Sequence, residues 1–76
     1  MLAIVVTIPK QHMHLLEKVR KLMPKSGIKY SDESWNIFVI TFNSSPKTIK
    51  EEFERIKPEI EKMGLQIAVL SCENLI

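Results

Sequence analysis

Residues 2–8 read Leu-Ala-Ile-Val-Val-Thr-Ile, and Pro9 follows them. Five of these seven residues are β-branched, which favours an extended strand over a helix. Because the run is almost continuously apolar, it is typical of a strand covered on both faces, and we expect it at the centre of a sheet. Pro9 suits the first turn of a helix, where no backbone donor is needed. The sequence therefore predicts a central strand over residues 2–8 with a helix directly after it.

A helical period follows Pro9 and continues to Met23. The apolar residues of this segment fall on one stripe of a helix, and they are Leu15, Leu16, Val19, Leu22 and Met23. The opposite side carries a row of basic side chains, here called the basic ridge, which consists of Lys10, His14, Lys18, Lys21 and Lys25. We expect Pro24 to end this helix and Ser26-Gly27 to form the turn after it.

The following segment has the pattern of a hairpin. Residues 28–30 and 35–42 are rich in apolar residues, and the polar stretch Ser31-Asp-Glu-Ser34 separates them. Alternation interrupted by a short polar stretch predicts a brief edge strand, a turn and a longer apolar strand. Neither Asn-Gly nor Asp-Gly marks the turn, so a single strand after a loop is the alternative.

A second helix is expected after Ser45-Pro46, which combines a hydroxyl cap with proline at the first helical position. Its apolar face repeats at spacings of four and three residues through Ile49, Phe53, Ile56, Ile60 and Met63. Pro58 interrupts the backbone hydrogen bonding, but the apolar phase continues across it, so we expect a kink and not a break. Gly64 caps the helix, residues 65–71 form the last strand, and residues 72–76 form a tail.

The predicted order is β-α-β-β-α-β, the ferredoxin-like arrangement, in which two helices pack on one face of a four-stranded antiparallel sheet. The first and third strands are central in that arrangement. The two most continuously apolar strands, residues 2–8 and 35–42, are the first and the third, which agrees with it. The whole chain, residues 1–76, is expected to form this single α+β domain.

Composition narrows the class of protein. An apolar fraction of 45% and a charged fraction of 26% are those of an ordinary globular domain. The longest apolar run, residues 2–8, is too short to span a bilayer as a helix and lacks the features of a secretory leader. Cys72 is the single cysteine and has no intramolecular partner. We therefore expect a cytoplasmic protein without a membrane partner.

The sheet face without helices is the expected site of action. If the bulkier alternate residues of the two central strands face the helices, the other face presents Ala3, Val5, Thr7, Ile37, Val39 and Thr41. An exposed apolar face marks an interaction site unless edge-strand side chains fold over it. If the bulkier residues of the two central strands instead face away from the helices, the exposed residues are more hydrophobic. Tyr30 and Trp35 flank the hairpin and are further candidate anchors of a protein contact, with ordinary rim packing as the alternative.

No residues combine into a catalytic or metal site. His12 and His14 lie two positions apart, so they do not share a helix face, and two ligands do not complete a zinc site. Cys72 is expected at the end of the sheet far from both histidines, which excludes a cysteine–histidine pair. Neither glycine belongs to a phosphate-binding loop. We expect no enzyme activity, no bound metal and no cofactor.

The expected function is a non-catalytic binding module that associates with another protein, including a second copy of itself as dimer or larger oligomer, through the open sheet face or an edge strand. The alternative function is nucleic-acid binding, and it is based on the distribution of charge along the chain. Residues 10–30 carry six lysines and arginines against one glutamate, and residues 31–76 carry five against eight acids. The basic ridge is therefore a candidate for contacting nucleic-acid phosphates without reading sequence.

Overall fold

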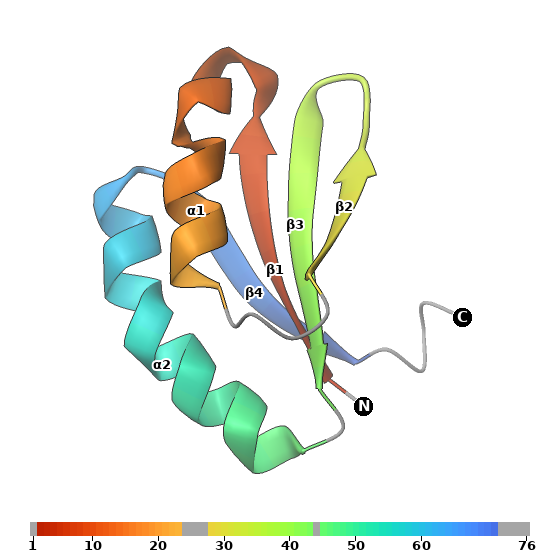
Figure 1. The fold of residues 1–76 in the computed structure, drawn as a ribbon, viewed down its shortest axis with the longest axis vertical. Helices are drawn as coiled ribbons and strands as arrows, with labels where there is room; N and C mark the ends of the chain where they lie inside the picture. Colours follow the sequence, from red (N-terminus) through yellow and green to blue (C-terminus); the bar gives the residue numbers. More distant parts are fainter. Residues whose placement is uncertain (1, 24–27, 44, 72–76) are drawn as a thin grey trace.

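The computed structural model describes residues 2–23, 28–43 and 45–71. These residues form an α+β fold with two α-helices, one 3₁₀ helix and a four-stranded antiparallel sheet (Figure 1). The elements in chain order are β1 (Leu2–Pro9), η1 (Lys10–Leu15), α1 (Leu16–Leu22), β2 (Ile28–Asp32), β3 (Asn36–Asn43), α2 (Pro46–Lys62) and β4 (Gln66–Ser71).

The strands lie in the order β2-β3-β1-β4, and all neighbours are antiparallel. The prediction that the first and third strands are central and the other two are edges is confirmed. The hairpin is confirmed as well, because β2 pairs with β3 and the Glu33 N–H donates to the Asn36 carbonyl across the turn at 2.9 Å. The alternative of one strand after a loop is therefore wrong.

The first helix differs from its prediction. Its N-terminal half is the 3₁₀ helix η1, in which His12 leaves helical geometry with φ −112° and ψ 27°, and the α-helix begins only at Leu16. Pro9 still pairs with Asn36 of β3, and the Lys10 N–H donates to the Trp35 carbonyl at 2.9 Å. Because the chain remains tied to β3 at this point, its first turn does not adopt α-helical geometry. The expected end at Pro24 and the turn at Ser26-Gly27 lie outside the described residues.

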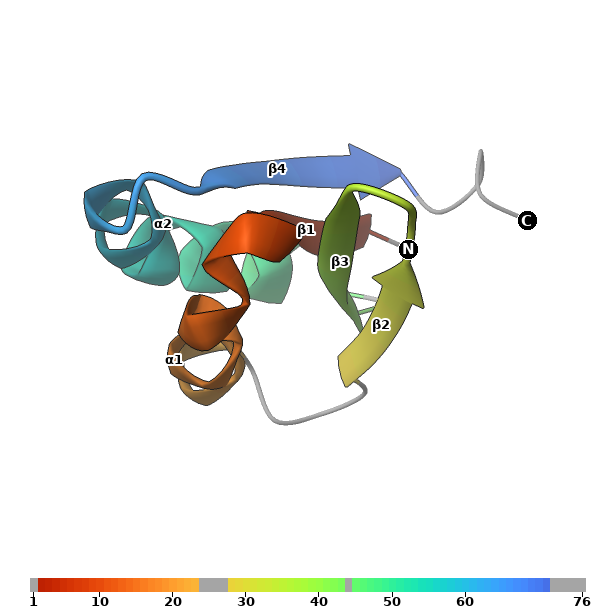
Figure 2. The same ribbon diagram turned by 90° about the horizontal axis from the view of Figure 1, so that it is seen from above.

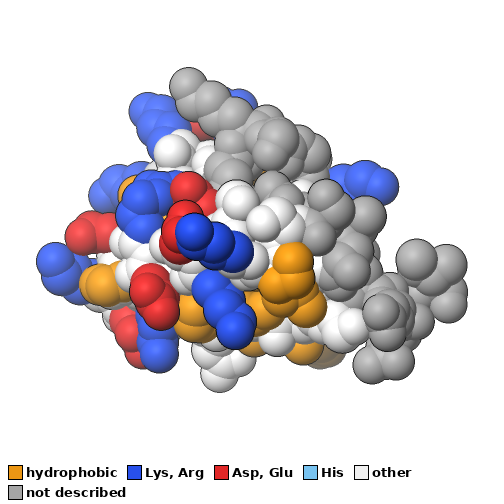
Figure 3. Space-filling model, turned by 90° about the horizontal axis from the view of Figure 1, so that it is seen from below, with side chains coloured by type: hydrophobic (Ala, Val, Ile, Leu, Met, Phe, Trp, Pro, Cys, Tyr) orange, Lys and Arg blue, Asp and Glu red, His pale blue; other side chains and the backbone are white. Residues whose placement is uncertain are grey.

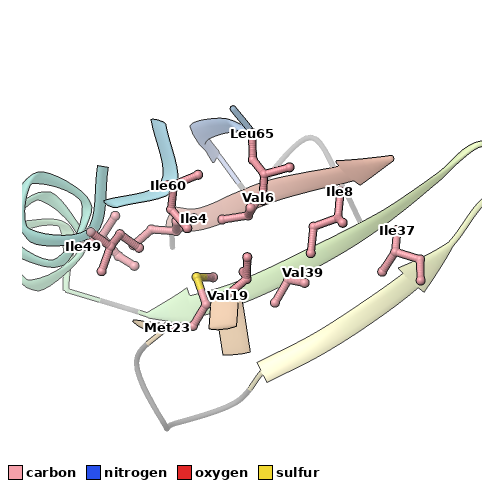
Figure 4. Close-up of a cluster of buried hydrophobic side chains, with 11 residues drawn as sticks. Ile4, Val6, Ile8, Val19, Met23, Ile37, Val39, Ile49, Ile60 and Leu65 are labelled. Carbon is pink, nitrogen blue, oxygen red and sulfur yellow. The ribbon is translucent and has the colours of Figure 1, made fainter. Parts of the chain in front are cut away.

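The hydrophobic core lies between the sheet and the two helices, which cover the same side of the sheet (Figures 2 and 4). Ile4, Val6 and Ile8 of β1 are fully buried and point to this side. The helices and flanking segments contribute a matching set of buried side chains, which are Val19, Met23, Ile49, Ile56, Ile60 and Leu65. Burying each such side chain contributes about 1.5–3 kcal/mol, so this layer supplies most of the stability of the domain.

The second helix follows its prediction closely. Ser45 caps it by accepting a hydrogen bond from the Thr48 N–H at 3.3 Å, and Pro46 occupies the first turn. The helix runs without a break through Pro58 to Lys62, so the expected continuity is confirmed. Gly64 then adopts a φ of 76°, the left-handed region that glycine reaches without strain. This turn leads the chain directly into β4.

The core contains a polar group that lacks a partner. The Thr41 side chain is 1% exposed, and no atom of the described residues forms a hydrogen bond with its Oγ1. Thr41→Val keeps the shape and removes the buried hydroxyl, so we expect the free energy of unfolding in urea to rise by about 1–3 kcal/mol. Thr48→Val is the control, because its exposed hydroxyl donates to Ser45 Oγ at 3.2 Å and its loss should not stabilise the protein. An unchanged or lowered stability of Thr41→Val would contradict this expectation.

Candidate protein interface

The candidate interface is the side of the sheet that faces away from the helices, here called the open face. Residues directly opposite each other in an antiparallel pair point to the same side. Because Ile4, Val6 and Ile8 point to the helices, the intervening residues of β1 and their cross-strand partners lie on the open face. The open face therefore consists of Ala3, Val5, Thr7, Pro9, Lys29, Ser31, Asn36, Phe38, Ile40, Phe42, Gln66, Ala68 and Leu70.

The predicted face of β3 is wrong. Ile37, Val39 and Thr41 were expected on the open face, but they lie opposite Ile8, Val6 and Ile4 and are at most 8% exposed beneath the helices. The prediction assumed that the bulkier residues of each strand fill the core. The register decides instead, because it pairs the bulky set of β1 with the slimmer set of β3. Phe38, Ile40 and Phe42 therefore point away from the helices.

The β1 residues lie on the predicted face but differ in exposure. Val5 and Thr7 are half-buried there, as expected of a surface strand. Ala3 is 0% exposed, so its expected accessibility is wrong. Its small side chain lies between two larger ones, with Phe42 opposite it on one neighbouring strand and Leu70 opposite it on the other.

The open face is mainly apolar. Phe38, Ile40 and Phe42 are half-buried, and Leu70 is 43% exposed. Lys29 is the basic side chain of this face, and its Nζ lies 5.4 Å from the ring centroid of Phe42, within the range of a cation–π contact. Edge-strand side chains were expected, as an alternative, to fold over this face, and Lys29 does so at the ring of Phe42. The surface around Ile40 and Leu70 keeps an apolar character suited to a contact with another molecule.

The two predicted aromatic anchors do not belong to the open face. Tyr30 is 49% exposed and lies opposite Val39, which places it on the helix side of the edge strand β2. Trp35 is 81% exposed in the turn before β3 and lines a hollow of about 460 Å³ together with Pro9 and Lys10. Tyr30 therefore lies on the opposite side of the sheet from Val5 and Thr7, and Trp35 lies in the turn beyond the end of the strand, beside Pro9.

The basic ridge is only partly present as a row of free cations. His14, Lys18 and Lys21 are exposed, and Lys25 lies outside the described residues. Lys10 Nζ forms an ion pair with Asp32 at 2.7 Å, which directs it toward β2. The ring of His14 lies 6.0 Å from that of His12 in an edge-to-face arrangement. The 3₁₀ geometry of η1 therefore interrupts the regular spacing on which the ridge was predicted.

Three pairs of oppositely charged side chains form along the helices α1 and α2. Arg20 pairs with Glu17 at 2.9 Å, Lys62 with Glu59 at 3.6 Å, and Arg55 with Glu52. Figure 3 shows the end of the molecule at which α2 begins, where side chains of both signs are interspersed around smaller apolar areas. The hydrogen bonds that Arg20 donates to Glu17 raise the pKa of its guanidinium, which stays charged at every pH near neutrality. Each of these pairs joins residues three positions apart, which are neighbours on a helix surface.

Other kinds of site find no support in the described part of the chain. No group of three or more histidine, cysteine, aspartate or glutamate side chains among those residues is placed to hold a metal ion. Within the same residues, no helix has the length and apolar character needed to cross a membrane. Comparison with family models, with curated proteins and with solved structures found no match to this chain.

Sequence reasoning missed the residues that give the open face its character, namely Phe38, Ile40, Phe42, Ala68 and Leu70. Their alternation with Ile37, Val39 and Thr41 was visible in the sequence. The missing information was the register of β1 against β3, which decides which alternate set is buried. A hairpin loop often fixes register, but β1 and β3 are joined through a helix and another strand, so no short turn relates them.

Proposed function

We propose that this protein is a non-catalytic binding module that associates with a second copy of itself through its sheet, at the open face or at an edge strand. We further propose that its fold belongs to the ferredoxin-like β-α-β-β-α-β class. The strand order and the alternation of elements along the chain support this assignment.

The apolar open face is the observation that carries the proposal. Helices cover one side of the sheet, whereas Phe38, Ile40 and Phe42 lie on the side that has no helical layer. A sheet face in contact with water usually carries polar side chains. Apolar residues on such a face gain free energy when a partner removes them from water, at about 25 cal/mol for each Å² buried.

The size of the domain supports the same conclusion. A chain of 76 residues buries only about 60% of the surface that its unfolded form exposes, so its single core supplies little surplus stability. Self-association is a common additional source of stability in domains of this size. A second copy is also the partner that is present whenever the protein itself is present.

Leu70→Asp is the test of self-association, because Leu70 lies on the open face and also belongs to the edge strand β4. We expect the unsubstituted protein to approach a dimer mass in multi-angle light scattering as its concentration rises. The added carboxylate should shift this rise to at least tenfold higher concentration, because a charge on an apolar interface must be desolvated.

Gln11→Asp is the matched control, since it adds the same charge at an exposed position of η1, outside the strands of the sheet. We expect its mass to follow that of the unsubstituted protein. A monomer mass for the unsubstituted protein across the whole concentration series would refute the proposed self-association.

Binding of nucleic acid by the basic ridge remains a prediction, and we do not propose it as a second function. One of its predicted phosphate contacts, Lys10, already has a carboxylate partner in Asp32.

A further inference from the structure

The two edges of the sheet differ in how they are protected. β2 carries Lys29 and Asp32, and charged residues on an edge strand oppose pairing with other strands. β4 consists of Gln66-Ile-Ala-Val-Leu-Ser71, with neither a charge nor a proline. Among the described residues it pairs with β1 on one side only, so within that part of the chain no strand pairs with the backbone donors and acceptors of its other side. Nothing in the sequence of β4 opposes the addition of a further strand.

We propose that β4 pairs antiparallel with β4 of a second copy and joins the two sheets into one. This inference rests on the proposed self-association and specifies which contact produces it. The occupant is a second copy because an antiparallel pair of identical strands is related by a two-fold axis, so each copy offers what the other needs.

The burial pattern of β4 restricts the register of this pair. Opposite residues must point to the same side of a continuous sheet. Even-numbered residues of one β4 therefore face even-numbered residues of the other, and odd-numbered residues face odd-numbered ones. Two registers of this kind each pair five of the six residues, one with the two-fold axis at Ala68 and one with it at Val69, and we propose the register with the axis at Ala68. It sets Ala68 opposite its own copy, Gln66 opposite Leu70 on the open face, and Ile67 opposite Val69 on the helix side. The exposed Leu70 side chain and the half-buried Ile67 and Val69 would all gain a neighbour.

Single cysteines introduced into a Cys72→Ser background test the register. Ala68→Cys should form a covalent dimer under mild oxidation, because opposite Cα atoms lie about 4.5–5.5 Å apart and a disulfide spans that distance. Gln66→Cys and Leu70→Cys should each stay uncrosslinked alone, since equivalent residues would be about 14 Å apart at 3.4 Å per residue. An equimolar mixture of these two variants should crosslink. Ser34→Cys, in the exposed turn, is the control for random collision.

The outcomes separate this inference from the proposed function. Crosslinking of Ala68→Cys and of the Gln66→Cys and Leu70→Cys mixture, well above that of Ser34→Cys, supports the edge pairing. A dimer mass without crosslinking of Ala68→Cys, lost in Ile40→Asp at the middle of the open face, overturns the edge pairing and leaves self-association standing. A monomer mass with no crosslinking above the control overturns both.

Discussion

The Val39→Asp variant should be unfolded at 25 °C. Val39 is 0% exposed and lies opposite Val6 in the core beneath the helices. A carboxylate at this position has no cation among the core residues, and burying an unpaired charge costs several kcal/mol. Domains of this kind have a total stability of about 5–15 kcal/mol, and a small one lies near the lower end. The far-UV circular dichroism spectrum should therefore lose its helical signal.

Ile40→Asp is the matched comparison one residue away. Ile40 points to the open face and is half-buried, so its aspartate reaches water without entering the core. This variant should keep the native spectrum and a cooperative thermal transition. A folded Val39→Asp or an unfolded Ile40→Asp would show that the two faces of β3 are exchanged relative to the structure.

Pro58→Ala should raise the stability of the domain. Pro58 lies inside the continuous helix α2 and is exposed, so replacing its ring removes no core packing. Proline supplies no N–H for the carbonyl of Glu54 and its ring crowds that carbonyl, at a cost of about 3 kcal/mol in a helix interior. The greater freedom of the unfolded alanine chain offsets part of this gain. We expect a net stabilisation of about 1–2 kcal/mol, which raises Tm by about 4–8 °C for each kcal/mol.

Pro46→Ala provides the control for this measurement. Pro46 is in the first turn of α2, where a backbone donor is not required and proline is favourable. Its replacement should leave Tm unchanged or lower it slightly. If both substitutions raised Tm by a similar amount, the gain would not come from the helix interior.

Helix α2 was predicted correctly from local sequence patterns. The start at Ser45-Pro46, the repeat of Ile49, Ile56 and Ile60, and the end at Gly64 were all predicted and are all present. Each depends on residues within one or two helical turns, so the sequence contains the necessary information. η1 shows the limit of such patterns, because its geometry depends on a bond from Lys10 to Trp35 in a distant strand.

The candidate interface was predictable only in part. That one face of the sheet lacks helices follows from the number and order of the elements. Val5 and Thr7 were placed on that face correctly, because alternation along β1 separates its two sides. Tyr30 and Trp35 were grouped with them because they flank the hairpin in sequence, but sequence proximity does not show the side of the sheet on which a residue lies.

The sequence by itself determined the order and type of most elements and the central position of β1 and β3, because apolar periodicity and turn residues act over short distances. Only the tertiary structure decided which side of β3 is buried. Ile37, Val39 and Thr41 alternate with Phe38, Ile40 and Phe42, and both sets are apolar enough to fill a core. The register against β1 selects the first set, since each member lies opposite a β1 residue that the helices cover. That register is a contact between strands far apart in the chain, and a shift of one residue would reverse every side chain.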